Sequence, residues 1–287
     1  MKIFITGGSG FIGSHVVKQA LAAGHIVTAL RYSSDRPKIP LPTQPAWVDG
    51  ALSDDWRAAL KGCDVLIHLA AAGVSMQNLE WEKLFQVNVE QSLNLWLQAA
   101  NAGVKRFIIT GSCFEYGSTA AQLEFIPADA PLLPTGPYHA SKAAATMAAL
   151  GLAVDRGLEL VLLRPFHVYG EGEAIPRFWP ALRKAALAGE DFPMTLGEQV
   201  RVFTPVEQVA AAFVAAVTRT DVQPGNPLIE NLACGQAQSL RDFAEHWWRV
   251  WNAKGRLIPG AVPYRANEIM RYVPAVTTPK NGPPSAA

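Results

Sequence analysis

Residues 2–13 read KIFITGGSGFIG and decide the fold of this chain. An apolar run with strand propensity is followed by glycines at three-residue spacing. Such glycines let the backbone turn tightly, approach a ligand phosphate and pack a helix on the strand. The helix that begins here would point free N–H groups and a partial positive charge at that phosphate. The segment predicts a dinucleotide site; an ordinary glycine-rich turn is the alternative. The predicted contacts are Gly7, Gly10, Phe11, Ile12 and Gly13.

Short β-rich runs alternate with helical patterns through the first 165 residues. Because the runs are apolar almost throughout, they are typical of parallel strands that crossover helices bury on both faces. We therefore expect an α/β fold, a Rossmann-type doubly wound parallel sheet. The expected strands are 2–6, 26–30, 46–48, 65–69, 106–110 and 158–163, and the expected helices are 10–23, 56–60, 81–102 and 138–155.

After Pro165 prolines become frequent and the alternation becomes irregular, which predicts a smaller C-terminal substrate domain over the carboxyl ends of the sheet. A helix-like stretch at 206–219 and a strand-like stretch at 228–233 predict that the two domains are partly interleaved. The expected parts are a dinucleotide-binding domain at 1–165 to which 203–233 returns, a substrate-binding domain at 166–202 and 234–276, and a mobile tail at 277–287.

The chain has 287 residues, of which 49% are hydrophobic and 17% are charged, and its formal net charge is +1. This balance offers no concentrated basic face, so we expect neither nucleic acid nor membrane as a partner. No apolar run reaches the roughly 18–20 residues that cross a bilayer, and the N-terminus reads as a strand rather than a signal peptide. The three cysteines form no disulfide framework and no metal-binding pair. We expect a cytoplasmic protein without a metal.

The second expected strand ends at Arg31, where a carboxylate usually accepts the adenosine ribose of NAD. The next carboxylate, Asp35, comes four residues later in a loop. A guanidinium is a forked partner for a 2′-phosphate, and Ser33 and Arg36 could add donors. The pattern therefore predicts NADP(H), with NAD less favoured. The alternative is that Arg31 stacks on adenine or only solvates the strand end.

Tyr138 and Lys142 lie four residues apart at a predicted helix start and share one helical face. A phenol titrates near ~10, and an ammonium one turn away favours the phenolate and lowers that pKa. The pair therefore predicts a tyrosine that acts as general acid and base. Ser112 directly follows another expected strand, at the edge where open α/β sheets bind ligands, and is expected to hydrogen-bond a substrate oxygen beside Tyr138.

Further motifs lie along the chain: TGGSGFIGSH (6–15), DVLIHLAA (64–71), FQVNVEQSLNLW (85–96), TGSCFEYG (110–117), YHASK (138–142), LRPFHVYG (163–170) and CGQAQSLRDFAE (234–245). Together they resemble the extended short-chain dehydrogenase/reductases of the NAD(P)-dependent epimerase/dehydratase family, which mostly act on nucleotide sugars. The resemblance implies that Ser112, Tyr138 and Lys142 form a catalytic triad and that Lys142 also holds the nicotinamide ribose. Its implied cofactor contacts further include Leu52, Leu69, Ala70, Ala71, Asn88, Pro165 and His167.

Substrate contacts are less defined by these patterns. His167 stands where the family has Asn and is expected to face the substrate layer, and Arg201 is expected to clamp a diphosphate. Cys113 follows Ser112 and could instead be a small packing residue. The full set of substrate candidates is Cys113, Phe114, His167, Arg201 and Arg265.

Three functions fit these residues. Dehydratases of the family need an Asp-Glu pair after the catalytic Ser or Thr, whereas Cys113 and Phe114 stand here, and strand alternation should turn Glu115 away. The favoured prediction is an NADP(H)-dependent reductase of a nucleotide-linked 4-keto-6-deoxy sugar, with Tyr138 as general acid. The alternative is a nucleotide-sugar epimerase that retains its cofactor without net redox. A catalytically silent NADP-binding regulator is the third.

Helices 81–102 and 138–155 carry apolar residues on more than one face. Such helices need burial beyond their own sheet. In the resembled family they commonly pair across a two-fold axis into a four-helix bundle, so we expect a homodimer.

Overall fold

The computed structural model describes residues 1–32, 35–74, 80–266 and 268–275. Its centre is a seven-stranded sheet in the order β11-β6-β5-β4-β1-β2-β3, in which all neighbours are parallel. The order reverses beside β1, and such a switch point creates a ligand crevice at the carboxyl ends of the strands. The expected doubly wound α/β fold is confirmed. The strands are β1 (Lys2–Thr6), β2 (Ile26–Arg31), β3 (Ala46–Asp49), β4 (Val65–His68), β5 (Arg106–Thr110), β6 (Glu159–Pro165) and β11 (Leu228–Leu232).

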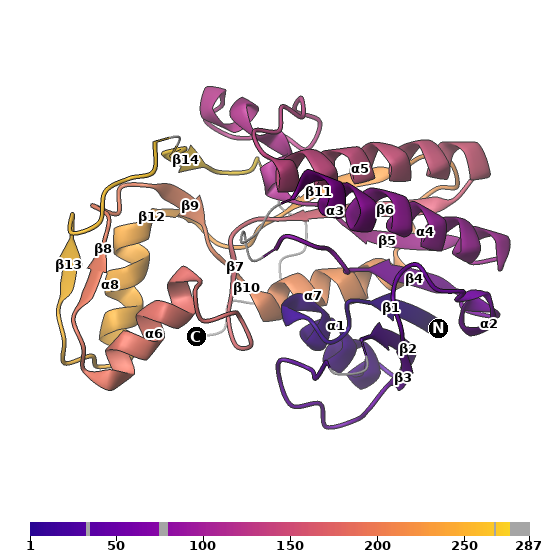
Figure 1. Cartoon of the computed structure of the whole chain (residues 1–287), viewed down its shortest axis with the longest axis horizontal. Coiled ribbons are helices and arrows are strands. Elements are labelled where there is room, and N and C mark those ends of the chain that lie inside the picture. Colours follow the sequence, from indigo (N-terminus) through magenta and orange to yellow (C-terminus); the bar gives the residue numbers. More distant parts are fainter. Residues whose placement is uncertain (33–34, 75–79, 267, 276–287) are drawn as a thin grey trace.

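Helices cover both faces of this sheet (Figure 1). On one face α1 (Phe11–Ala22) packs beside α7 (Val206–Ala215) over apolar side chains of β1, β4 and β6. The opposite face is covered by α2 (Arg57–Leu60), α4 (Ser92–Asn101) and α5 (Pro137–Arg156), and α3 (Trp81–Phe85) packs against α5. Burial on both faces explains why the strands are apolar almost throughout.

The expected helix 81–102 is not continuous. A π-helical turn, η1 (Gln86–Gln91), separates α3 from α4. The Ser92 hydroxyl donates to the Val87 carbonyl at 3.0 Å, and Asn88 turns inward at this point. Such single π turns recur at functional sites because they redirect one side chain without ending the helix.

A smaller layer stands to one side of the sheet, at the left of Figure 1. Its helices α6 (Phe178–Ala188) and α8 (Leu240–Val250) pack through an aromatic and aliphatic cluster. Its short strands pair as β10-β7, β12-β9-β14 and β13-β8. The strand bounds are β7 (Val168–Tyr169), β8 (Phe192–Met194), β9 (Val200–Val202), β10 (Thr204–Pro205), β12 (Ala237–Ser239), β13 (Leu257–Pro259) and β14 (Arg271–Tyr272).

The chain passes between the two layers more than once. After β10 it enters α7 and the short 3₁₀ helix η4 (Ala216–Thr218), then adds β11 to the main sheet before β12 and α8. The domain boundaries given above remain a prediction. The tail 277–287 lies outside the described residues.

Candidate active site

The glycine turn between β1 and α1 leaves no room for side chains. A Cβ on Gly7, whose φ is +67°, would lie 2.7 Å from the Ala70 nitrogen, and a Cβ on Gly13 would lie 1.9 Å from the Gly7 carbonyl oxygen. Gly10 N–H closes the turn by donating to that carbonyl at 3.0 Å. Bare backbone therefore borders the crevice, together with Leu69 and Ala70 directly after β4. These residues fit a dinucleotide diphosphate.

Asn88 braces the segment that follows β4. Its amide oxygen accepts the Ala72 N–H at 2.7 Å, and its amide nitrogen donates to the Ala72 carbonyl at 3.1 Å and to the Ser141 hydroxyl at 3.0 Å. Asn88 therefore ties the stretch after Leu69–Ala71 to α5 and shapes the expected cofactor edge, by which we mean the glycine turn and residues 69–72. Leu52, expected near the adenine, is buried beside Leu30.

Arg31 is already paired. Its Nε donates to the Asp49 carboxylate at 2.9 Å, and its guanidinium lies 4.7 Å from the centre of the Trp47 ring. Asp49 ends β3 and is the register partner of Arg31 on the neighbouring strand. Asp35 folds back so that the Ser9 hydroxyl donates to its carboxylate at 3.4 Å. The expectation that no carboxylate stands at the strand tip was therefore wrong, because the loop and the next strand supply two.

Ser33 and Arg36 were the other residues predicted around this tip. Ser33 lies outside the described residues. Arg36 donates from Nη1 to the Asp35 carbonyl at 3.2 Å, so part of its guanidinium engages the loop backbone.

Ser112, Tyr138 and Lys142 meet at the carboxyl edge of β5. Ser112 precedes the 3₁₀ helix η2 (Cys113–Tyr116), and Tyr138 lies in the first turn of α5 and hydrogen-bonds Ser112. The Lys142 ammonium donates to the Thr110 carbonyl at 2.7 Å. All three predicted catalytic side chains are buried. The fold thus brings two distant motifs into contact.

The proton affinity of Tyr138 differs from the expectation. Burial raises the pKa of Tyr138 to about 12, while the Ser112 hydrogen bond and the charge of Arg177 act against that rise. Lys142 was expected to lower this pKa, but its ammonium is directed to Thr110, and burial lowers the pKa of Lys142 itself. Desolvation outweighs the nearby charges. In the protein alone Tyr138 is therefore a proton donor at neutral pH.

The segment after Ser112 is a 3₁₀ turn rather than a strand. Side chains therefore do not alternate between two faces here, as the prediction for Glu115 assumed. Glu115 does avoid the crevice, because it turns beneath Ser112 and pairs with Arg164 at 2.9 Å. Burial raises the pKa of the Cys113 thiol to about 12, which leaves it a neutral packing group. Phe114 stacks on His139 with ring centres 5.1 Å apart.

His167 follows β6 and Pro165 in a left-handed conformation, with φ +36°. Aromatic rings surround it: Tyr272 at 5.8 Å, Phe203 at 6.2 Å and Phe114 at 6.3 Å. Burial lowers its pKa to about 3, so the imidazole is neutral. Within the part of the chain that the structure describes, its buried Nε2 has no hydrogen-bond partner. A left-handed non-glycine residue with an unpaired polar atom is a mark of a binding site.

The two arginines expected to hold a diphosphate lie differently. Arg201 is buried and donates to the Glu268 carboxylate at 3.0 Å and to the Ile269 carbonyl. Arg265 is exposed on the segment that leads to Glu268. The pairing with Glu268 neutralises Arg201, which weakens its expected role as a clamp.

The connection between β7 and α6, residues 170–177, forms a strap against the cofactor edge. His15 Nε2 on α1 lies 2.9 Å from the Glu171 carbonyl oxygen, and a Cβ on Gly172 would lie 2.8 Å from the Lys38 Cβ. Arg177, at the start of α6, donates to the Val74 carbonyl after β4. The strap therefore contacts segments that follow β1, β2 and β4. Sequence reasoning missed it, although the glycines and the Pro-Arg step mark a turn and a helix start.

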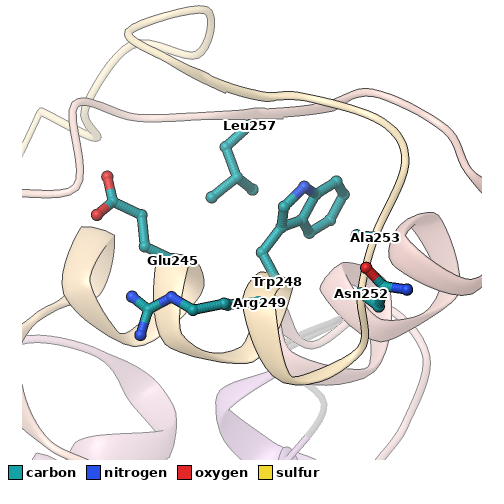
Figure 2. A pocket seen from close by; sticks show the side chains of 6 residues that line it. All are labelled: Glu245, Trp248, Arg249, Asn252, Ala253 and Leu257. Atoms are coloured by element: carbon teal, nitrogen blue, oxygen red, sulfur yellow. The ribbon is translucent and has the colours of Figure 1, made fainter.

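A recess on the smaller layer is not part of this site. Figure 2 shows it over α8, lined by Glu245, Trp248, Arg249, Asn252, Ala253 and Leu257. The polar group of Trp248 is already paired, because its indole N–H donates to the Gly255 carbonyl at 3.0 Å. The described ranges contain no group of three or more His, Cys, Asp or Glu side chains that could hold a metal. Among the same residues, no helix is both long and apolar enough to span a membrane.

Comparisons with known proteins agree with this geometry. The model of the NAD dependent epimerase/dehydratase family matches residues 3–230. The chain belongs to this family of extended short-chain dehydrogenase/reductase enzymes, which confirms the resemblance drawn from the motifs.

Its relatives include sugar-nucleotide enzymes. UDP-glucose 4-epimerase of Streptomyces lividans is 31% identical over 271 residues, which cover 87% of this chain and 80% of that enzyme. The structure of UDP-N-acetylglucosamine 4-epimerase from Methanobrevibacter ruminantium M1, in complex with UDP-N-acetylmuramic acid, matches with a TM-score of 0.84 and 25% identity over 96% of this chain and 89% of that one. MoeE5 in complex with UDP-glucose and NAD matches with a TM-score of 0.81 and 27% identity over 97% of this chain and 90% of that one.

Proposed function

We propose that this protein is a nucleotide-sugar 4-epimerase that keeps a nicotinamide cofactor bound through turnover. The observation that carries this proposal is the buried contact between the Ser112 hydroxyl and the Tyr138 phenol, which sets one proton-transfer group beside one hydrogen-bonding group. The 4-epimerase names of the relatives with 31% and 25% identity support the same reaction. None of the relatives reported above is named as a reductase of a nucleotide sugar.

Epimerisation at one carbon needs a proton taken from a sugar hydroxyl and later returned to the same oxygen. Tyr138 is the group assigned to this transfer, and Ser112 is assigned to hydrogen-bond the same sugar oxygen. The bound nicotinamide would supply reversible hydride chemistry. Lys142 is assigned to the ribose next to Tyr138. Leu69–Ala71 and the glycine turn would hold the rest of the dinucleotide.

Water elimination would need a further acid and base beside Ser112. Cys113 is a neutral packing thiol, Phe114 cannot exchange a proton, and Glu115 is engaged by Arg164. These three side chains therefore argue against a 4,6-dehydratase.

The strap at 170–177 supports a retained cofactor. It meets α1 at His15, the loop after β2 at Lys38 and the segment after β4 at Val74. An enzyme that exchanges its cofactor at every turnover must open such contacts each time, whereas an epimerase completes both hydride transfers with the cofactor in place.

The function is tested by supplying UDP-glucose, UDP-galactose and their N-acetyl forms to the purified protein. We expect one pair to interconvert without added cofactor and without net change in nicotinamide absorbance, while denatured protein releases a nicotinamide dinucleotide. Stoichiometric consumption of NADPH with a nucleotide 4-keto-6-deoxyhexose would instead establish the reductase. Binding without turnover of any sugar nucleotide would indicate the silent regulator.

The Tyr138→Phe variant should fold and retain its cofactor but lose activity by about 10²-fold or more, because the ring remains and only the proton-transfer hydroxyl is removed. The control is Tyr264→Phe, since the Tyr264 hydroxyl bonds Glu198 in the smaller layer. Initial rates of sugar interconversion check both variants. Activity of Tyr138→Phe within a few-fold of the wild type would mean that another group moves the proton.

We propose NAD as the cofactor, because Asp49 already pairs with Arg31 and Asp35 contacts Ser9 of the glycine turn, so that both carboxylates would repel a 2′-phosphate near this strand end. The cofactor-free protein should bind NAD about 10-fold more tightly than NADP, corresponding to about 1.4 kcal/mol. Asp49→Asn should narrow or reverse this preference, whereas Asp191→Asn, which breaks an exposed pair with Arg256, should not. Calorimetric titration provides the affinities. Tighter binding of NADP than of NAD by the wild type would support the NADP(H) prediction made from Arg31 instead.

We further propose a homodimer through α3 and α5. Trp81, Met147 and Val154 on these helices are 53%, 61% and 62% exposed in the single chain, which suits a buried helix face. Light scattering should yield about twice 30.9 kDa. Met147→Glu should halve the mass, whereas Leu187→Glu on α6 should leave it unchanged. A wild-type mass near 30.9 kDa would contradict the dimer.

A cytoplasmic location is proposed on the cysteines. Cys63, Cys113 and Cys234 are all free thiols. Unpaired thiols are typical of proteins in reducing compartments.

A further inference from the structure

Glu115 is fully buried beneath Ser112, with none of its surface exposed. Its Oε1 accepts the Ser112 backbone N–H at 2.7 Å. Its Oε2 accepts the Thr146 hydroxyl and Arg164 Nε, each at 2.9 Å. Thr146 lies on α5 one turn beyond Lys142, and Arg164 lies on β6. One carboxylate therefore ties the serine to the helix that carries Tyr138 and to the central sheet.

All of these hydrogen-bond partners donate to the carboxylate. Arg164 is itself fixed, because its Nη1 donates to the Tyr116 hydroxyl at 2.9 Å and to the Ala128 carbonyl at 2.8 Å. A carboxylate that accepts on both oxygens is held ionised, even though burial raises the pKa of Glu115. A buried ion pair adds little net stability compared with apolar packing. Stability alone therefore does not explain why the Glu115–Arg164 pair lies beside the candidate active site.

We propose that Glu115 is a positioning residue for the epimerase reaction: it orients Ser112 toward Tyr138 and supplies a fixed negative charge beneath the proton-transfer site. This proposal rests on the proposed function for the roles of Ser112 and Tyr138. Glu115 itself lies below the serine and is not assigned any contact with substrate.

The charge of Glu115 acts on both titrating neighbours. Burial is the main cause of the raised pKa of Tyr138 and the charge of Glu115 adds to it, whereas at Lys142 burial lowers the pKa and Glu115 opposes that change. Of the ionised groups, Glu115 and Arg177 shift the pKa of Tyr138 most, and they act in opposite directions. The titratable and charged groups around this site are Cys113 and Tyr116 on η2, Lys142 on α5, Arg164 on β6, His167 after β6, Arg177 before α6, Arg201 on β9 and Tyr272 on β14.

The Glu115→Gln variant separates charge from shape. An amide has one oxygen and one NH₂ group, so one side of the substituted side chain must place donors against donors. The side toward Arg164 and Thr146 offers two donors, one of them charged, and will hold the amide oxygen. The NH₂ group then faces the Ser112 N–H, and the serine loses its anchor.

The expected result is a kcat at least about 10-fold lower with KM for the nucleotide sugar within about 3-fold, because the serine is displaced rather than removed. The acidic limb of the kcat–pH profile should also move to lower pH by about half a unit or more, because loss of the negative charge favours the Tyr138 phenolate. An unchanged kcat, or a lower kcat with an unmoved limb, would overturn the proposal.

Two controls isolate the effect. Glu159→Gln breaks another Arg–Glu pair, the more exposed Arg106–Glu159 pair at 2.7 Å, at the opposite end of β5 and β6, and should leave the pH profile unchanged. Thr146→Val removes one donor to Glu115 but keeps the charge, so it should not move the acidic limb. If the acidic limb of the kcat–pH profile moved by a similar amount in either control, the effect would come from a general loss of rigidity, and the proposal would be overturned.

A second measurement needs neither substrate nor the single variant. The double variant Glu115→Gln/Arg164→Met removes both charges of the ion pair, so neither charge is left buried without its partner. The absorbance difference between each protein and its Tyr138→Phe form reports the phenolate of this tyrosine alone. The phenolate should begin to form at lower pH in the double variant than in the wild type, and coincident curves would overturn the proposal. This result does not depend on which sugar the enzyme converts.

Discussion

The backbone of Gly13 approaches the Gly7 carbonyl so closely that a Cβ would stand 1.9 Å from the oxygen. This contact seats α1 directly on the sheet and aims its N-terminus past the end of β1. Because the strands are parallel, the ends of β4, β5 and β6 open at the same edge. The cofactor edge, the Ser112 turn and the strap all stand around the crevice that this close packing leaves.

Chemistry at that edge depends on burial as much as on residue type. Tyr138 and Lys142 are shielded from water, and desolvation shifts the pKa of each away from its charged form. Neighbouring charges then set the balance, with Glu115 below the serine and Arg177 on the strap acting in opposite directions on Tyr138. Under the proposed function such a site would handle one proton at one oxygen, which suits a reversible exchange better than an elimination.

The residue at the end of one strand does not by itself determine which nicotinamide cofactor binds there, because neighbouring segments change the local charge. Arg31 alone resembles a phosphate partner, but the parallel register of β2 and β3 sets Asp49 beside it. The loop that follows β2 then returns Asp35 to the glycine turn. A cation that is already paired with a carboxylate has little attraction left for a phosphate, and the second carboxylate adds negative charge beside the glycine turn.

The sequence by itself determined the α/β class, the strands of the central sheet, most of the helices that flank it, the glycine turn and the Ser112, Tyr138 and Lys142 set, because these depend on local periodicity and fixed spacing. Tertiary structure decided the π turn at Asn88, the pairing of Arg31 with Asp49, the burial of Glu115 against Arg164 and the strap at Arg177. Each of these features depends on contacts between residues that are far apart in the sequence. The distances between those residues, and their removal from water, are set only when the chain has folded. The pKa of each group in the site depends on such neighbours. The sequence could therefore identify the enzyme family but not the one reaction that the protein catalyses.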